Sequence, residues 1–280
     1  MPVKLIASLL LCLTLGACST KMAYNYLDWI LEWYVGDLVS LTEDQEWQFR
    51  NALARQLDWH RKKQLPLYVK SLNDLHNAID NEFTLESLQR MYNEQENGLN
   101  ELIKQITPTL SELLATLTDS QVEQLMESLE EQNQELEEEY VKKPSDELVA
   151  QRAERMIDRA ENWVGTLNES QTQLITNWSR QIRPTAEQWI ANRRAWQTKL
   201  GSSLREKRHT ADFNKHIEDL FVNSDKTWSD AYRADFEYNR NLVFNMLVNL
   251  ENTLSDRQRQ HLLEEIAVLR KQLTELHQQN

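Results

Sequence analysis

Apolar residues recur along most of this chain at spacings of three and four residues, which is the period of an α-helix rather than a β-strand. No stretch alternates convincingly between apolar and polar positions, and the 280 residues include only five Gly and five Pro. The sequence therefore predicts an all-α fold. The strongest stripe is coiled-coil-like and consists of Leu262, Ile266, Leu269, Leu273 and Leu276.

Proline positions divide the predicted helices. We expect Pro66 to bend or break the helix that starts near Thr42, and Pro108 to kink or interrupt the one that starts near Thr84. The clearest linker candidate is the segment 142–145, Lys-Lys-Pro-Ser.

Four predicted helix starts share one pattern: Leu, then Thr, Asn or Ser, then an acid, any residue, and Gln. The small polar residue is the expected N-cap, and the Gln can close a capping box with it. The acid lies at the positive end of the helix dipole. The four N-cap and Gln pairs are Thr42 with Gln45, Thr118 with Gln121, Asn168 with Gln171, and Ser255 with Gln258.

The spacing of these motifs indicates a duplicated unit. Their leucines are 76 residues apart in the first pair (Leu41, Leu117) and 87 apart in the second (Leu167, Leu254). Thr84 and a threonine at position 210 each lie 43 residues after the first Leu of their pair and mark a further helix start. We expect an elongated bundle of two tandem helical modules, residues 37–145 and 146–280, which can pack as a pseudo-dimer.

The N-terminus is typical of a bacterial lipoprotein. Lys4 precedes an apolar run, residues 5–15, that is too short to span a bilayer, which takes about 20 residues. We predict a signal peptide over residues 1–17. Its ending, Leu-Gly-Ala-Cys, resembles a lipobox, which implies cleavage before Cys18 and acylation of its thiol. Ser19 favours sorting to the outer membrane, facing the periplasm; the alternative is an ordinary signal peptide with an incidental cysteine.

Residues 18–36 follow this site and form a predicted aromatic juxtamembrane helix. Tyr26, Trp29, Ile30 and Trp33 share one helical face. A helix that is apolar over much of its girth is either buried or interfacial, and Trp and Tyr suit the headgroup level of a membrane. The segment therefore either packs on the first module or lies in the membrane interface.

Two known families share motifs with this chain. The Leu-Thr-x-x-Gln motif, twice per module, resembles the Spy/CpxP family of helical periplasmic proteins, which implies an ATP-independent, chaperone-like or stress-adaptor function. The cradle of Spy is basic, whereas this chain is acidic. The lipoprotein N-terminus, with Tyr-Leu-Asp-Trp at 26–29, Trp-His-Arg at 59–61 and Gln-Leu-Pro at 64–66, resembles an uncharacterised family of proteobacterial lipoproteins.

Composition narrows the possible partners. The net charge of −13 argues against nucleic acid and against charge-driven adhesion to anionic lipid. One of the two cysteines, Cys12, lies in the predicted signal peptide, so no disulfide is expected in the mature chain. The acidic charge concentrates in the first module, and the second is nearly balanced.

Basic and tryptophan residues concentrate between Trp178 and Arg208. Trp189, Arg193 and Trp196 fall on one predicted helical stripe, in which Arg193 is placed for cation–π stacking. This stripe is either core, with flanking arginines that neutralise the first module, or a groove for acidic, partly apolar or unfolded polypeptide. The candidate polypeptide-binding residues are Trp59, His60, Trp178, Trp189, Arg193 and Trp196.

No enzyme motif occurs in the sequence, which has no Gly-rich phosphate loop, no His-Glu-x-x-His and no nucleophile elbow. We expect no catalytic residues, cofactor, metal or small-molecule substrate. The leading hypothesis is a chaperone-like or envelope-stress protein, anchored by acylated Cys18, that binds unfolded or envelope proteins. The alternative is a structural or adaptor lipoprotein that docks one specific envelope partner.

Overall fold

The computed structural model describes residues 16–279, with side chains from residue 20 onward, and over this range the protein is an all-α, elongated helical bundle without strands. The predicted signal peptide and Cys12 lie outside the described residues. The helices of the first half are α2 (Gly16–Asn25), α3 (Leu27–Leu38), α4 (Glu43–Lys63), α5 (Leu65–Asn81), α6 (Leu85–Ala115) and α7 (Asp119–Tyr140). The second half contains α8 (Ser145–Val164), α9 (Glu169–Gln181), α10 (Ala186–Glu206), α11 (Phe213–Val222), the 3₁₀ helix η1 (Ser224–Thr227), α12 (Asp230–Asn252) and α13 (Asp256–Gln278).

The four capped helix starts are confirmed. At α4, α7, α9 and α13 the N-cap side chain accepts the backbone N–H of the Gln three residues on, and that Gln side chain accepts the N-cap N–H. Thr84 forms the same box with Ser87 at the start of α6. The expected start at Thr210 is wrong, because its hydroxyl lies 2.7 Å from both the Lys207 carbonyl and an Asp212 carboxylate oxygen and does not cap a helix, and α11 begins only at Phe213.

The breaks between helices follow the sequence at Pro66 and at the linker candidate, and of the two outcomes expected at Pro108, a kink or an interruption, the interruption does not occur. Pro66 lies in the first turn of α5, directly after the end of α4. Residues 142–144 of the linker candidate lie in the connection between α7 and α8, and Ser145 begins α8. Pro108, in contrast, lies inside α6, which continues through it to Ala115. Its missing N–H costs one hydrogen bond, but α6 is held along its length by α11, α4, α5 and α12, so the helix is not interrupted.

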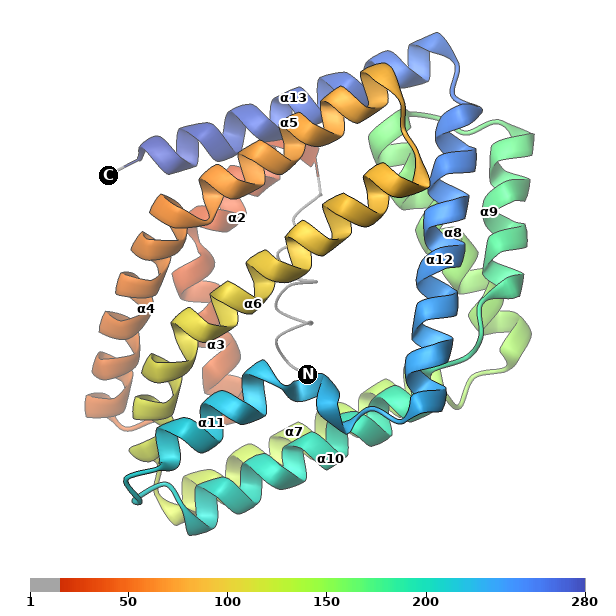
Figure 1. The fold of residues 1–280 in the computed structure, drawn as a ribbon. Coiled ribbons are helices and arrows are strands. Elements are labelled where there is room, and N and C mark those ends of the chain that lie inside the picture. Colours follow the sequence, from red (N-terminus) through yellow and green to blue (C-terminus); the bar gives the residue numbers. More distant parts are fainter. Residues whose placement is uncertain (1–15, 280) are drawn as a thin grey trace.

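Helices of the two halves interleave. Figure 1 shows most of the helices along the sides of a four-sided frame that α6 crosses, with α13 beside α5 on one side and α7 beside α10 on another. Thus the last helix of each half packs on a middle helix of the other half. The third large contact, between α6 and α11, also joins the halves.

The main hydrophobic core lies where α6, α7, α10 and α11 meet, and it therefore contains residues of both halves. Its buried side chains include Ile103, Val122, Leu125, Leu129, Trp196, Leu200, Leu204, Phe213, Ile217 and Phe221. A second core joins Tyr24 of α2 and Leu65 of α5 to Leu273 and Leu276 of α13. The predicted coiled-coil-like stripe of α13 is therefore its contact with α5. Over residues 16–279, no helix is both long enough and apolar enough for a membrane span.

Candidate functional site

The first two motifs meet in space through their glutamines. The Gln45 amide donates to Oε1 of Gln121 at 3.0 Å, and the Gln121 amide donates back to Oε1 of Gln45 at 2.7 Å. Each Nε2 also donates to a backbone carbonyl, Gln45 to Thr116 at 2.9 Å and Gln121 to Ser40 at 2.8 Å. We call this arrangement the first glutamine junction.

The third and fourth motifs form a second glutamine junction with the same hydrogen bonds. Gln171 donates to Oε1 of Gln258 at 3.1 Å and Gln258 donates back at 2.9 Å. The carbonyl acceptors are Thr253 for Gln171 at 3.1 Å and Thr166 for Gln258 at 2.9 Å. Gln171 is completely buried.

The same rule holds at all four positions: the accepting carbonyl lies two residues before the N-cap of the partner motif. Each glutamine Nε2 donates twice, and each Oε1 accepts from an N-cap N–H and from the partner amide. Only a primary amide offers donors and an acceptor in this arrangement. The junctions therefore require Gln, where a capping box alone tolerates Glu.

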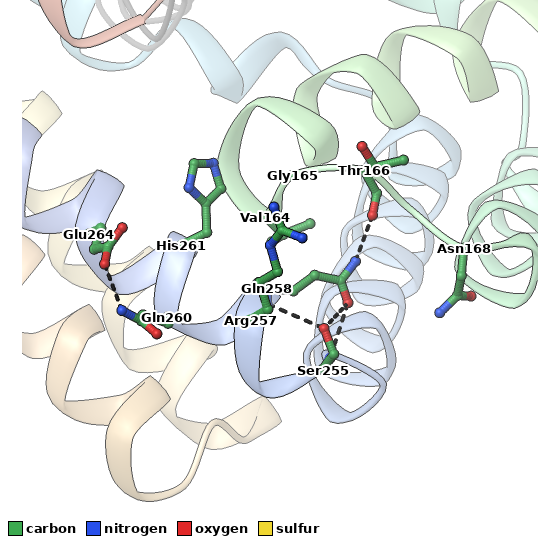
Figure 2. Close-up of a pocket in the computed structure, with 10 residues that line it drawn as sticks. All are labelled: Val164, Gly165, Thr166, Asn168, Ser255, Arg257, Gln258, Gln260, His261 and Glu264. Carbon is green, nitrogen blue, oxygen red and sulfur yellow. Dashed lines mark hydrogen bonds between the residues drawn. The ribbon is translucent and has the colours of Figure 1, made fainter.

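A polar hollow of about 730 Å³ lies beside the second junction. Figure 2 shows its lining, in which Gln258 bonds Ser255 and Thr166 while His261 and Glu264 extend from α13. The lining residues are Val164, Gly165, Thr166, Asn168, Ser255, Arg257, Gln258, Gln260, His261 and Glu264. Gly165 adopts φ +77°, a conformation that favours glycine. The hollow is thus bordered by the loop that contains Gly165 and is lined by exposed hydrogen-bonding groups.

The candidate tryptophans and Arg193 face the interior. Trp196, Trp178 and Arg193 are buried, and Trp59 and Trp189 are half-buried. Trp196 belongs to the main core and donates its Nε1–H to the Leu220 carbonyl at 2.9 Å. The burial agrees with the core interpretation of the stripe. A polypeptide would reach Trp178, Arg193 and Trp196 only if the surrounding helices separated.

Arg193 does not stack between tryptophans as its position in the stripe led us to expect. It is 1% exposed, and its Nε donates to Asn133 Oδ1 at 2.7 Å and its Nη2 to Gln132 Oε1 at 3.0 Å. Asn133 also donates to Gln197 at 2.6 Å. We call Asn133, Arg193 and Gln197 the polar seam between α7 and α10. The guanidinium turns toward α7 because amide oxygens are available there.

The charge of Arg193 has no carboxylate to compensate it within the described part of the chain, and burial lowers its pKa. Nη1 of Arg193 has no hydrogen-bond partner there either. The next residue differs: Arg194 bonds Glu130 at 2.7 Å and also pairs with Glu137 at the surface. The polar seam is therefore the least satisfied part of the α7–α10 contact.

His60 joins three helices at the break between α4 and α5. It is 6% exposed, with Nδ1 3.0 Å from the Tyr24 hydroxyl and Nε2 3.4 Å from the Tyr68 hydroxyl. Burial lowers the pKa of His60 to about 4. Burial also raises the pKa of Tyr24 and that of Tyr68. His60 is thus a neutral packing residue between two tyrosines, away from Arg193.

The sequence identified the caps but not the junctions between them, because pairing joins segments about 80 residues apart. The similar spacing of the motifs within the two pairs, 76 and 87 residues between their leucines, is the sequence feature that relates each motif to its partner. In the described residues, no cluster of His, Cys, Asp and Glu has the composition of a metal site.

The fold and the junctions define an all-α protein in which four helix starts are joined in pairs through two glutamine junctions. Residues 37–233 match the model of a family of unknown function, DUF6279, and the chain belongs to that family. The matched range includes the first junction and the polar seam and ends before α13. No curated protein matches the chain. No solved structure matches it either.

Proposed function

We propose that the protein is a non-enzymatic adaptor lipoprotein, anchored to the periplasmic face of the outer membrane through acylated Cys18, that docks one specific envelope protein. The anchor is inferred from the signal-peptide pattern and the Leu-Gly-Ala-Cys ending. Mass spectrometry of the mature protein tests it, with a diacylglyceryl group on Cys18 as the expected N-terminus. An unmodified or differently cleaved N-terminus rejects the anchor.

One observation favours binding of a single partner protein over chaperone-like binding of unfolded proteins. The tryptophan and arginine side chains that suit a polypeptide cradle are used in internal packing, whereas the polar hollow at the second junction is preformed and exposed. A fixed set of hydrogen-bonding groups discriminates between partners, because a partner that leaves them unpaired is penalised. Arg257, Gln260 and Glu264 are exposed in this hollow.

Site-specific crosslinking in cells tests the docking proposal. With a photoreactive residue in place of Gln260, we expect one dominant crosslinked protein; with the same residue in place of the exposed Gln173 on α9, we expect none. Arg257→Glu should weaken the product about tenfold, the effect of losing a charged hydrogen bond. Equal products at both positions, or none at Gln260, contradict the proposal.

A second candidate function, chaperone-like binding of unfolded proteins, is favoured by the polar seam. A buried arginine without a carboxylate weakens the α7–α10 contact, so this contact is where the bundle would open and present Trp196 and Leu200. Many crosslinked products, together with suppression of aggregation of an unfolded model protein at stoichiometric amounts, would favour this function over the adaptor.

A further inference from the structure

Four large side chains form an exposed row along α2 and α3. Met22, Tyr26, Trp29 and Trp33 are 64%, 59%, 64% and 64% exposed. Although α2 ends at Asn25, helical hydrogen bonds continue across Tyr26, from its N–H to the Met22 carbonyl at 3.1 Å and from the Ile30 N–H to its own carbonyl at 3.0 Å. The spacing of four residues places Met22 next to Tyr26 at the end of α2, and the same spacing places Trp29 and Trp33 on one face of α3. We call these four side chains the aromatic row.

The other face of the same helices is fixed to the bundle. Tyr24 packs in the core with α5 and α13, and Leu27 is buried. Lys21 bonds Glu275 of α13 at 2.8 Å, and Glu32 bonds Arg50 of α4 at 3.0 Å. The aromatic row is therefore exposed although the helices that carry it are packed on the bundle through their other face.

Cys18 precedes this row by one helical turn. It lies in α2, four residues before Met22, and continues the series of positions that the row occupies. An acyl chain on Cys18 brings the first turn of α2 to the bilayer surface. Tryptophan and tyrosine are the side chains that favour the headgroup level, where an apolar ring and a polar N–H or O–H are both accommodated.

We propose that the aromatic row lies in the headgroup layer of the membrane, so that α2 and α3 rest along the membrane surface and orient the whole bundle. This inference rests on the anchor at Cys18 proposed above. The charges on the segment specify the lipid: Asp28 and Asp37 are exposed, and Lys21 is neutralised by Glu275. The occupant is therefore a zwitterionic headgroup layer, entered through apolar and aromatic contact rather than through attraction to anionic lipid.

Fluorescence quenching of the acylated protein tests this contact. The full protein is reconstituted in phosphatidylcholine vesicles whose acyl chains carry bromine near the headgroup, a quencher that acts at short range. We expect quenching of tryptophan emission that largely disappears in Trp29→Phe/Trp33→Phe. Trp47→Phe is the matched control, because Trp47 is 68% exposed but lies on α4, and this variant should retain the quenching.

The outcomes separate the anchor from the row. If the protein carries the acyl group and floats with vesicles but shows no quenching that depends on Trp29 and Trp33, the membrane contact of the aromatic row is rejected. The acyl anchor at Cys18 is then still supported. Absence of the acyl group in mass spectrometry overturns the anchor first. Quenching that appears only after phosphatidylglycerol is added contradicts a zwitterionic contact. Crosslinks between two copies through Trp33 identify a second chain as the occupant and also overturn the proposal.

Discussion

Buried polar side chains in this protein differ in how well their surroundings satisfy them. His60 has a hydroxyl at each ring nitrogen, while Arg193 has two amide partners and no carboxylate within the described residues. Burial disfavours the charged form of both groups. The result of burial differs, because histidine can stay neutral at neutral pH whereas arginine stays charged.

His60 makes stability depend on pH. In the unfolded chain it takes up a proton near pH 6.5, but in the folded protein only near pH 4. Protonation between these values therefore stabilises the unfolded state, and stability is lost as the pH falls from 6.5 toward 4. We expect a loss of about 1.5 kcal/mol between about pH 6.5 and pH 5, measured by urea unfolding, because lowering the pH by one in this window favours the unfolded state by up to about 1.4 kcal/mol, and by less near pH 6.5, where His60 of the unfolded chain is only half protonated.

The control for this prediction is His60→Phe, which removes the titrating group and keeps an aromatic ring. Its unfolding free energy should change much less over the same pH range. The pKa values of Asp119, Glu130 and Glu137 are lowered by arginine partners, so these groups reduce stability only at lower pH. An unchanged slope in His60→Phe would assign the pH dependence to other groups.

Arg193→Glu should destabilise the protein strongly. The new carboxylate would be buried opposite the amide oxygens that now accept from Arg193, with no cation to pair with. A loss of about 3–5 kcal/mol in unfolding free energy is expected, as for other unpaired buried charges. Arg194→Gln is the neighbouring control, and breaking its partly exposed ion pairs should cost about 1 kcal/mol or less. A stable Arg193→Glu protein would show that the polar seam is accessible to water.

At the level of helices, the glutamine junctions set how the chain enters four of its helices. Each junction fixes two helix starts against each other, so the direction of both helices depends on one amide pair. Loss of one glutamine leaves the partner amide, an N-cap N–H and a backbone carbonyl without their hydrogen bonds. These losses occur together, and three of the four glutamines, Gln45, Gln121 and Gln171, are buried.

Gln171→Ala should therefore cost about 2–4 kcal/mol of unfolding free energy, since several buried hydrogen-bonding groups lose partners at once. Gln173→Ala, two residues along α9 and exposed, should cost less than about 0.5 kcal/mol. In a double-mutant cycle, Gln171→Ala and Gln258→Ala should be strongly non-additive. Additive effects would show that the two amides act as independent caps.

The sequence predicts these helix starts well because a capping box is local. Thr42 and Gln45 are three residues apart, and their chemistry alone predicts the hydrogen bonds between them. The partner of Gln45 is Gln121, which no local rule identifies. The stripe with Arg193 and Trp196 was likewise predicted as one helical face, but not that α7 and α11 would cover it. The expected helix start at Thr210 is wrong because a threonine with an acid two residues on, here Asp212, also fits a turn.

At the level of the whole molecule, the halves defined by the motif spacing do not form separate packing units. The α13–α5, α7–α10 and α6–α11 contacts all cross between residues 37–145 and 146–280. The main core also contains side chains from both segments. Burial of apolar surface is the dominant stabilising term in folding, and here much of it requires both halves.

We therefore expect neither segment to fold when expressed alone. Circular dichroism should show reduced helicity for each fragment and its recovery when the two are mixed, because each supplies the helix on which the other packs. The intact chain should unfold in one transition by circular dichroism and by tryptophan fluorescence. A fragment that unfolds cooperatively alone would show that the modules are independent.

The contact between α2 and α13 has a mechanical consequence for a chain that is tethered at Cys18. If Cys18 carries the proposed acyl anchor, tension from the membrane would enter the molecule at α2, which contacts α13 through Tyr24, Leu276 and the Lys21–Glu275 pair. The load therefore passes at once into the far end of the sequence and, through α5, into the middle of the chain. A molecule with these contacts should resist stepwise unfolding, one helix at a time, under force applied at Cys18.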